Sequence, residues 1–234
     1  MRRFFGNKKG DKFFVEGEEF VHLRSVLRLA VGDEIILSLD DEFDYVCQVE
    51  KIEKTCAVCA LKEKILCEAN PKKNVVLFQA LAKSQKFDII VQKATELGVS
   101  EIVPFVTEFS VVKPTENKVE RLKSIAMNAC KQCERSIMPK IANVSTVSDV
   151  VGRFGEFDAV LFANERTKDG QPFENLDKCE NIAIIVGAEG GFSQKEKDVF
   201  VDAGATSISL GKRILRCETA SIAMMSLVSV LSGN

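Results

Sequence analysis

The stretch Asn181-Ile-Ala-Ile-Ile-Val-Gly-Ala-Glu-Gly-Gly-Phe-Ser-Gln-Lys-Glu196 decides the fold class of this 234-residue chain. Its first six residues are almost continuously apolar, which is typical of a strand buried on both faces of a parallel sheet. A glycine-rich loop follows, and Ser193 and Glu196 have the spacing of a capping box that opens a helix. The order strand, glycine loop, helix predicts an α/β fold with a ligand-binding loop at the carboxyl end of the strand.

The glycine loop itself does not identify a ligand. Gly187 and the pair Gly190-Gly191 are spaced wrongly for GxGxxG and for a P-loop, and no Gly-Lys-Ser/Thr follows them. A tight turn without a ligand is an equally good interpretation of the loop alone.

Strands and helices alternate on both sides of this stretch. The hydrophobic pattern predicts further strands at 75–80, 102–106, 158–163 and 206–210, and helices at 87–97, 119–133, 193–203 and 220–231. Repeated β-α units predict a mostly parallel sheet covered on both faces. We therefore predict one α/β domain over residues 74–234.

The first seventy residues have a different pattern. Short strands are predicted at 33–39, 45–49 and 56–61, and Phe20, Leu23 and Leu27 have helical spacing. The polar stretch 68–74 is typical of a linker. This pattern predicts a small β-barrel or meander with one helix over residues 1–70.

Composition excludes several classes of protein. Lys and Arg total 32 against 34 Asp and Glu, a net charge of −2, so no global basic field attracts nucleic acid. A single histidine, His22, excludes a multi-histidine metal site. No apolar run reaches 18 residues and no signal peptide is visible, so we expect a cytoplasmic protein that does not span a membrane.

Eight cysteines raise the question of zinc, because Cys56 with Cys59 and Cys130 with Cys133 form two Cys-x-x-Cys pairs. The first pair lies in a predicted strand, where residues three apart point to opposite faces, and about seventy residues separate the pairs. We therefore prefer buried or half-buried thiols and predict no metal.

A second loop adds a cluster of cations. Lys212, Arg213 and Arg216 follow the last predicted strand with no acidic residue between Leu210 and Cys217. Such a cluster is suited to phosphate groups, although a solvated loop with cations paired to nearby carboxylates is an equal alternative. A third loop, Asn164-Glu-Arg166, follows strand 158–163.

These motifs together resemble a known family. Gly187 to Gly191 with Leu210 to Ala220 is similar to the ribosomal RNA small-subunit methyltransferase E family, which belongs to the knotted SPOUT methyltransferases. Three other segments support the resemblance in the same order along the chain, namely His22 to Leu29, Gln92 to Val99 and Ala129 to Arg135.

The resemblance implies a PUA-like β-barrel that binds RNA over residues 1–70, and a SPOUT-type α/β domain with a deep trefoil knot over 74–234. It implies methyl transfer from S-adenosylmethionine to N3 of a uridine in 16S ribosomal RNA, within the 30S subunit, by a homodimer. The implied cofactor-binding residues are Leu161, Phe162, Ala163, Asn164, Val186, Gly187, Ala188, Glu189, Gly190, Gly191, Leu210, Gly211, Arg213, Ile214 and Leu215.

The chain departs from the family pattern at three positions. The family commonly has Pro where this chain has Ala188 and Lys212, and Thr where it has Cys217. A thiol donates hydrogen bonds poorly, so we expect Cys217 to be structural.

Methylation at N3 requires the loss of a proton from uridine and stabilisation of the resulting anion. We expect Arg216 to stabilise that anion. Glu218 either accepts the proton or caps the last helix and orients Arg216, and Glu189 is either a base or an organiser of its loop.

Two segments carry the local positive charge that RNA binding needs. Residues 1–28 have a surplus of three cations and residues 113–140 a surplus of four. The predicted RNA-binding residues are Arg3, His22, Arg24, Arg28, Lys83, Lys93, Arg135 and Lys212. For His22 capping or packing is favoured over catalysis, and Phe4 and Phe5 are expected in the core.

Two alternatives stay open. A SPOUT enzyme that methylates the ribose 2′-oxygen would carry similar loops, and a non-catalytic RNA- or ribosome-binding protein would use the glycine loop only as a turn.

Overall fold

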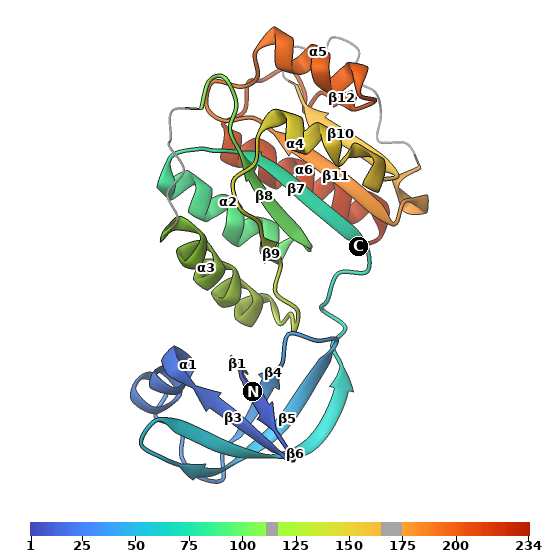
Figure 1. The fold of residues 1–234 in the computed structure, drawn as a ribbon. Helices are drawn as coiled ribbons and strands as arrows, with labels where there is room; N and C mark the ends of the chain where they lie inside the picture. The colour runs from blue at the N-terminus through green and yellow to red at the C-terminus, as the bar shows by residue number, and fades with distance from the viewer. Residues whose placement is uncertain (111–116, 165–174) are drawn as a thin grey trace. The chain divides into compact units, whose positions relative to one another are not determined.

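The computed structural model describes residues 1–110, 117–164 and 175–234 and divides into two compact units (Figure 1). Unit 1 consists of Met1–Asn70 with Cys130–Met138, and unit 2 of Pro71–Ala129 with Pro139–Asn234. Within the described residues no helix is long and apolar enough to cross a membrane.

Unit 1 is built on a six-stranded sheet of order β1-β4-β5-β6-β3-β2. The strands are β1 (Arg2–Phe5), β2 (Asn7–Lys9), β3 (Lys12–Glu16), β4 (Glu34–Ser38), β5 (Phe43–Ile52) and β6 (Cys56–Leu66). β1 pairs with β4 in parallel, and the other neighbours are antiparallel. The core holds Phe4, Phe13 and Leu37, among others, so Phe4 lies in the core as predicted.

The predicted helix of unit 1 is split into two turns. α1 (Gly17–Val21) continues directly into a π-helical turn, His22–Val26, and Arg28 then adopts a left-handed backbone conformation with φ 55°. The expected apolar stripe is retained, because Phe20 and Leu23 are buried and Leu27 packs against the same cluster.

Segment 130–138 clusters with unit 1, although the predicted second domain of 74–234 included it. The Asn70 side chain accepts hydrogen bonds from the backbone amides of Ser136 and Ile137 at 3.0 and 3.1 Å. Ser136 Oγ donates to the carbonyl of Asp41 at 2.5 Å. These bonds join residues more than 60 positions apart, so no local pattern could reveal them.

Unit 2 is an α/β domain whose described strands all pair in parallel, in the order β12-β10-β11-β7-β8-β9. They are β7 (Asn74–Ala80), β8 (Glu101–Phe105), β9 (Lys140–Ile141), β10 (Ala159–Ala163), β11 (Asn181–Val186) and β12 (Thr206–Ile208). The helices are α2 (Ser84–Glu96), α3 (Asn117–Cys133), α4 (Val147–Gly152), α5 (Gln194–Asp202) and α6 (Cys217–Ser232), and only the end of α3, from Cys130 on, belongs to unit 1. The predicted parallel sheet is confirmed, and β11 has the predicted bounds.

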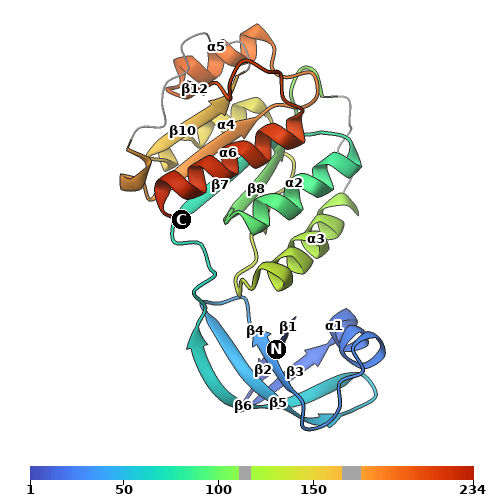
Figure 2. The same ribbon diagram turned by 180° about the vertical axis from the view of Figure 1, so that it is seen from behind.

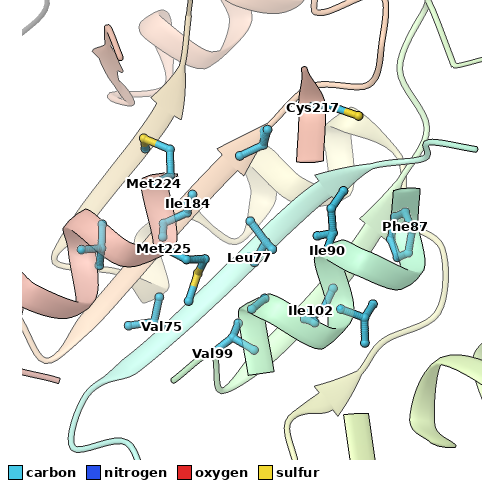
Figure 3. Packing of buried hydrophobic residues seen from close by; sticks show 14 of the residues in the cluster. Val75, Leu77, Phe87, Ile90, Val99, Ile102, Ile184, Cys217, Met224 and Met225 are labelled. Atoms are coloured by element: carbon cyan, nitrogen blue, oxygen red, sulfur yellow. The ribbon is translucent and has the colours of Figure 1, made fainter. Parts of the chain in front are cut away.

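Helices cover both faces of this sheet (Figures 1 and 2). Val75 and Leu77 of β7 lie in one hydrophobic cluster with residues of α2 and α6, and Figure 3 shows part of it. Val76 and Phe78 lie in the other cluster with Phe200 of α5. This alternation explains why β7 and β11 are apolar at nearly every position.

The strand order places the carboxyl ends of three strands together. β10 lies between β12 and β11 and is parallel to both, so the three strands end side by side (Figure 1). Ligands of open α/β sheets bind beyond the carboxyl ends of the strands.

The predicted thiol environments are confirmed. Cys56, Cys59 and Cys130 are buried and Cys133 is half-buried, and all are free thiols. Among the described residues no three His, Cys, Asp or Glu side chains gather as they would around a metal ion.

Candidate functional site

A cavity of about 370 Å³ lies where the end of β10 meets the glycine loop, residues 187–192, and the cation-rich loop, residues 210–216. This volume is in the usual range for small-molecule sites. Its lining comes from the end of β10, the glycine loop, the cation-rich loop and the starts of α2 and α6. The lining residues are Lys86, Ala163, Asn164, Val186, Gly187, Ala188, Glu189, Gly190, Gly191, Phe192, Leu210, Gly211, Arg213, Ile214, Leu215, Arg216, Cys217 and Ala220.

The glycine loop turns so tightly that side chains would not fit inside it. A Cβ atom on Gly187 would lie 3.1 Å from the Cα of Gly191, and the Gly191 amide donates to the Ala188 carbonyl at 3.0 Å. A Cβ atom on Gly190 would lie 2.7 Å from the Cβ of Phe109. Gly191 has φ 67°, a conformation that glycine adopts without strain. The glycines are therefore required by packing as well as by the turn.

A buried glutamine holds the start of this loop. Gln79 of β7 is fully buried, and its Nε2 donates to the carbonyl of Gly187 at 3.2 Å. Its Oε1 accepts a hydrogen bond from Ser221 of α6 at 2.5 Å, and the same hydroxyl contacts the Cys217 carbonyl at 2.8 Å. One polar side chain thus ties the glycine loop to the first turns of α6.

Lys86 of α2 lies between two carboxylates. Its Nζ is 3.1 Å from Glu189 Oε1 and 3.9 Å from Glu218 Oε2. Burial alone would raise the pKa of Glu189, but its hydrogen bonds, including that from Lys86, outweigh burial and lower the pKa. The hydrogen bond with Glu189 also raises the pKa of Lys86. Both groups are therefore charged at neutral pH.

Cys217 shares this corner of the cavity and opens α6 (Figure 3). Burial, and then a hydrogen bond from its Sγ to Glu218 Oε2 at 3.3 Å, raises the pKa of the thiol to about 12. The thiol is therefore protonated at neutral pH and is a poor nucleophile. A structural role, as the sequence predicted, agrees with this environment.

The cation-rich loop is much more open. Arg213 and Arg216 are exposed, and no carboxylate of the described residues forms an ion pair with either. Ile214 is 85% exposed although it lines the cavity. Arg216 is the residue before α6, and its carbonyl accepts the amide of Ala220 at 2.8 Å. The ion-paired alternative considered for these cations thus has no support in the described part of the chain.

Most of the predicted cofactor residues surround this cavity, but two do not. Leu161 and Phe162 lie within β10, and their side chains are buried in the two hydrophobic clusters. Glu218 is not among the residues that line the cavity, and its Oε2 accepts a hydrogen bond from Cys217 Sγ at 3.3 Å. Arg166 lies outside the described residues.

The sequence interpretation missed Lys86, Phe192 and Ala220, and it did not assign Cys217 to the cavity wall. Lys86 follows the carboxyl end of β7, so the rule that ligands bind beyond strand ends could have found it. The rule needed the knowledge that β7 neighbours β11, which the sequence does not contain.

The predicted RNA-binding residues fall into two groups. The first group is at least partly exposed. In unit 1 it contains the exposed Arg24 and Arg28 and the half-buried His22, and in unit 2 the exposed Lys83 and Lys212 and the half-buried Lys93. Lys93 is paired with Glu96 at 2.8 Å. Of the basic segment 113–140, Lys113 lies outside the described residues.

Arg3 and Arg135 require a correction. The Arg3 side chain is 5% exposed and contacts both carboxylate oxygens of Asp44, at 2.5 and 2.7 Å. Arg135 is 2% exposed. Neither guanidinium is presented at the surface, so we remove both from the RNA-binding set.

Two protein families match the chain. Residues 68–229 match the RNA methyltransferase domain, and residues 15–59 match the RNA methyltransferase PUA domain. The first match covers the whole cavity. The second lies within unit 1.

Curated relatives and a solved structure agree with these matches. The ribosomal RNA small subunit methyltransferase E of Bacillus subtilis (strain 168) is 31% identical, over 93% of this chain and 89% of the relative. The protein of the same name from Mesomycoplasma hyopneumoniae (strain 232) is 33% identical, over 96% and 97%. A Legionella pneumophila structure, reported as a methyltransferase with the bound cofactor SAM (S-adenosylmethionine), has a TM-score of 0.87 and 26% identity, over 98% of this chain and 97% of that one. The resemblance noted in the sequence is therefore confirmed, and the chain belongs to the ribosomal RNA small subunit methyltransferase E family.

Proposed function

We propose that this protein transfers a methyl group from S-adenosylmethionine to N3 of a uridine in 16S ribosomal RNA. One observation carries the proposal, namely that a glycine cradle lines the same cavity as a cation-rich loop whose Arg213 and Arg216 have no carboxylate partner among the residues that the structure describes. The names of the curated relatives and the cofactor of the Legionella structure agree with it.

The residues around the cavity fit S-adenosylmethionine. The cofactor combines an adenine ring, ribose hydroxyls and an amino-acid group that carries both charges. Leu210, Leu215 and Ala220 supply apolar surface for a ring, and the glycine loop lets backbone groups approach closely. Glu189 and Arg213 supply charges of both signs. When bound, the cofactor supplies a methyl group on a positively charged sulfur, which is an excellent leaving group.

The protein's task is then to orient the uracil ring and to stabilise its N3 anion. Arg216 is the proposed anion stabiliser, because it lines the cavity and its guanidinium has no carboxylate partner in the described residues. Its place just before α6 fixes the backbone from which it extends.

The two carboxylates suit different roles. Glu189 is bonded to Lys86, and its lowered pKa makes it a weak base, which favours its role as an organiser of the glycine loop. Glu218 accepts a hydrogen bond from the Cys217 thiol and lies 3.9 Å from Lys86 Nζ. We retain two roles for it, either as the acceptor of the N3 proton or as the residue that orients Arg216.

RNA contacts outside the cavity are assigned to His22, Arg24 and Arg28 of unit 1 and to Lys83, Lys93 and Lys212 of unit 2. We propose that the 16S RNA is bound within the 30S subunit. Because ribosomal RNA is the substrate, the proposed location is the cytoplasm.

We also propose the trefoil knot that the resemblance implies, and a PUA-like barrel for unit 1. β12 lies on the outer side of β10, whereas the next helix, α6, packs against β11 and α2. The chain after β12 must therefore cross back over the ends of β10 and β11, which is the kind of crossing that a knot requires. Segment 165–174, which follows β10, lies outside the described residues.

A homodimer is the proposed assembly. α6 exposes Leu227, Val230 and Leu231, an apolar strip that a second copy of the chain would cover. No metal is proposed for the reaction, because methyl transfer from a sulfonium needs alignment and anion stabilisation, which the residues above supply.

Equilibrium binding of S-adenosylmethionine tests the enzymatic proposal first. We expect saturable binding by the folded protein, and no detectable binding by a folded protein would favour the RNA-binding alternative. Identification of the methylated nucleoside after reaction with 16S RNA tests the position. 3-Methyluridine is expected, and a 2′-O-methylated nucleoside would favour the ribose alternative.

A further inference from the structure

One exposed aromatic side chain stands beside the glycine loop. Phe109 is 45% exposed and is the only aromatic residue among the exposed large hydrophobic side chains of the described chain. Other described phenylalanines, such as Phe105 and Phe192, are buried in the hydrophobic clusters. Single exposed hydrophobic side chains are common on protein surfaces, so it is the position of Phe109 next to a ligand cavity, and not its exposure alone, that needs an explanation.

Phe109 lies directly against the cavity wall. A Cβ atom built on Gly190 would lie 2.7 Å from Cβ, 3.4 Å from Cγ and 3.7 Å from Cδ2 of Phe109. Gly190 lines the cavity, so Phe109 packs on the residue that separates it from the ligand space. Phe109 is not itself a cavity-lining residue, so its ring lies next to the wall of the candidate active site rather than inside it.

The turn that carries Phe109 is fixed in place. The Ser110 hydroxyl accepts a hydrogen bond from the Thr107 amide at 3.0 Å, and the Ser110 amide donates one to the Thr107 carbonyl at 3.0 Å. The Glu108 amide donates to Glu196 Oε1 at 2.8 Å.

Glu196 links this turn to the glycine loop. Its other oxygen, Oε2, accepts a hydrogen bond from the amide of Ser193 at 2.8 Å. One buried carboxylate therefore joins the turn that carries Phe109 to the end of the glycine loop. The exposure of Phe109 therefore belongs to an ordered turn that is anchored to the cofactor wall.

The proposed reaction needs a surface of this kind. N3 of uridine lies on the Watson–Crick edge, so the base must leave its stack before the methyl group can reach it. Unstacked bases are held by aromatic side chains, and this protein has no tryptophan and one tyrosine, Tyr45, which is buried. Lys86, Arg213 and Arg216 can contact the edges of a base but offer no aromatic ring.

We propose that Phe109 stacks against an unstacked base of the substrate RNA next to the cavity. The inference rests on the proposed function and assigns a residue to substrate binding in addition to the cationic contacts. The ligand class is a single-stranded nucleobase, and a contact between two copies of the chain is the rival that the experiment must separate.

The absence of tryptophan allows a direct test, because Phe109→Trp creates a protein with a single indole. We expect 16S RNA to quench its fluorescence in a saturable manner, since stacking on a base quenches indole emission. Phe157→Trp is the matched control. Phe157 is half-buried, packs edge-on against Phe78 and precedes β10, at the opposite end of the sheet from the cavity, so no quenching is expected there.

Phe109→Leu tests the contribution to turnover. Base stacking on aromatic side chains is strong enough that its loss should raise the KM for RNA about tenfold or more. The dissociation constant of S-adenosylmethionine, the thermal midpoint and the sedimentation coefficient should stay unchanged. Phe109→Tyr should restore the KM.

Three results would overturn the inference while the wild-type enzyme is active: an unchanged KM for Phe109→Leu, the absence of quenching in Phe109→Trp, or a changed oligomeric state. An equal loss of cofactor affinity in Phe109→Leu would also overturn it, because it would show that the ring only supports the glycine loop. If the wild type itself transfers no methyl group, the proposed function fails, and quenching of Phe109→Trp then decides whether the ring binds RNA.

Discussion

Two loops line the same cavity but are held in different ways. The glycine loop, residues 187–192, is fixed by Gln79 beneath it, by Phe109 beside it and by Lys86 across from it. Its last residue, Phe192, is buried against Phe200, with ring centroids 5.2 Å apart. The cation-rich loop, residues 210–216, is almost wholly exposed, and a Cβ atom on Gly211 would touch nothing within 4 Å.

The difference separates two tasks of one site. The glycine loop forms the fixed wall of the cavity, where backbone groups must be placed accurately. Hydrogen-bond donors that are misplaced lose most of the stabilisation that they give to a ligand or transition state. The cation-rich loop, which carries Arg213 and Arg216, forms the open wall of the cavity and makes few contacts with the rest of the protein. We therefore infer that bound cofactor and RNA order it. The following changes test this division of labour.

The largest effect is expected for Arg216→Ala on the open wall. Loss of a cation that stabilises the developing N3 anion should lower kcat about 100- to 1,000-fold, as for other donors to a transition-state anion. The dissociation constant of S-adenosylmethionine should change by less than about threefold. Single-turnover methylation together with calorimetric cofactor binding measures both quantities.

Lys195→Ala removes an exposed cation of α5, outside the cavity, and serves as the matched control. It should leave kcat unchanged. Retained turnover in Arg216→Ala would show that another group stabilises the anion.

Gly190→Ala tests the packing of the glycine loop, the fixed wall of the cavity. The new methyl group would lie 2.7 Å from Phe109 Cβ, so either the loop or the turn must shift. Overpacking of this kind destabilises by about 1–3 kcal/mol, and cofactor affinity should fall at least tenfold because the loop lines the cavity. Thermal unfolding and cofactor binding check these values. Gly155→Ala, which adds a methyl group in open space, is the control, and equal behaviour of the two variants would contradict the tight packing.

Gln79→Leu removes the support beneath the fixed wall. The carbonyl of Gly187 and the hydroxyl of Ser221 each lose a buried partner, which costs about 1–3 kcal/mol of unfolding free energy. Denaturant titration measures the loss. Ser221→Ala should cost less, and the double variant should be less destabilised than the sum of the two, because both changes break the same network. Additive effects would argue against a shared network.

Lys86→Met tests the ion pair on the fixed wall through its pH dependence. The lowered pKa of Glu189 stabilises the fold above about pH 4.3, the usual value for an unfolded Glu, and this stabilisation is lost as pH falls through the lowered folded pKa. We therefore expect Lys86→Met to lower the free energy of unfolding at neutral pH, by an amount that shrinks on acidification. Urea titrations from pH 3 to 7 measure it, and a difference that grows at low pH would contradict the assignment.

The smallest effect is expected for Ile214→Ala on the open wall. The side chain is 85% exposed, so the free energy of unfolding should change by less than about 0.5 kcal/mol. Cofactor affinity should fall a few-fold if the loop closes on the ligand. A loss of stability in the free protein would show that this wall is also fixed.

Much of unit 2 could be predicted because its signals are local. The apolar run that becomes β11 and the capping box of Ser193 and Glu196 each depend on a few consecutive residues, and both are present. α6 begins at Cys217, three residues before the predicted start, because Arg216 already has the extended conformation of a helix-capping residue. The cavity followed from the rule that loops after parallel strands bind ligands.

The rest depended on partners far apart in the chain. Arg3 is charged and near the N-terminus, which predicted RNA contact, but Asp44 pairs with it from 41 positions away. The short strand Asn7–Lys9 is fully exposed and has no hydrophobic pattern, so it was missed. Lys86 lines the cavity because the strand order sets β7, which precedes α2, next to β11.

Hydrogen exchange of backbone amides, with and without S-adenosylmethionine, tests the division between the two walls most directly. The Gly191 amide is bonded within its loop, whereas in the part of the chain described here no amide of residues 211–216 donates a backbone hydrogen bond. We predict slow exchange of the Gly191 amide in the free protein with little further change, and fast exchange over 210–216 that slows at least tenfold when the cofactor binds. Equal protection of the two loops in the free protein, or no response of residues 210–216 to the cofactor, would contradict the assignment of a fixed wall and a ligand-ordered wall to this cavity.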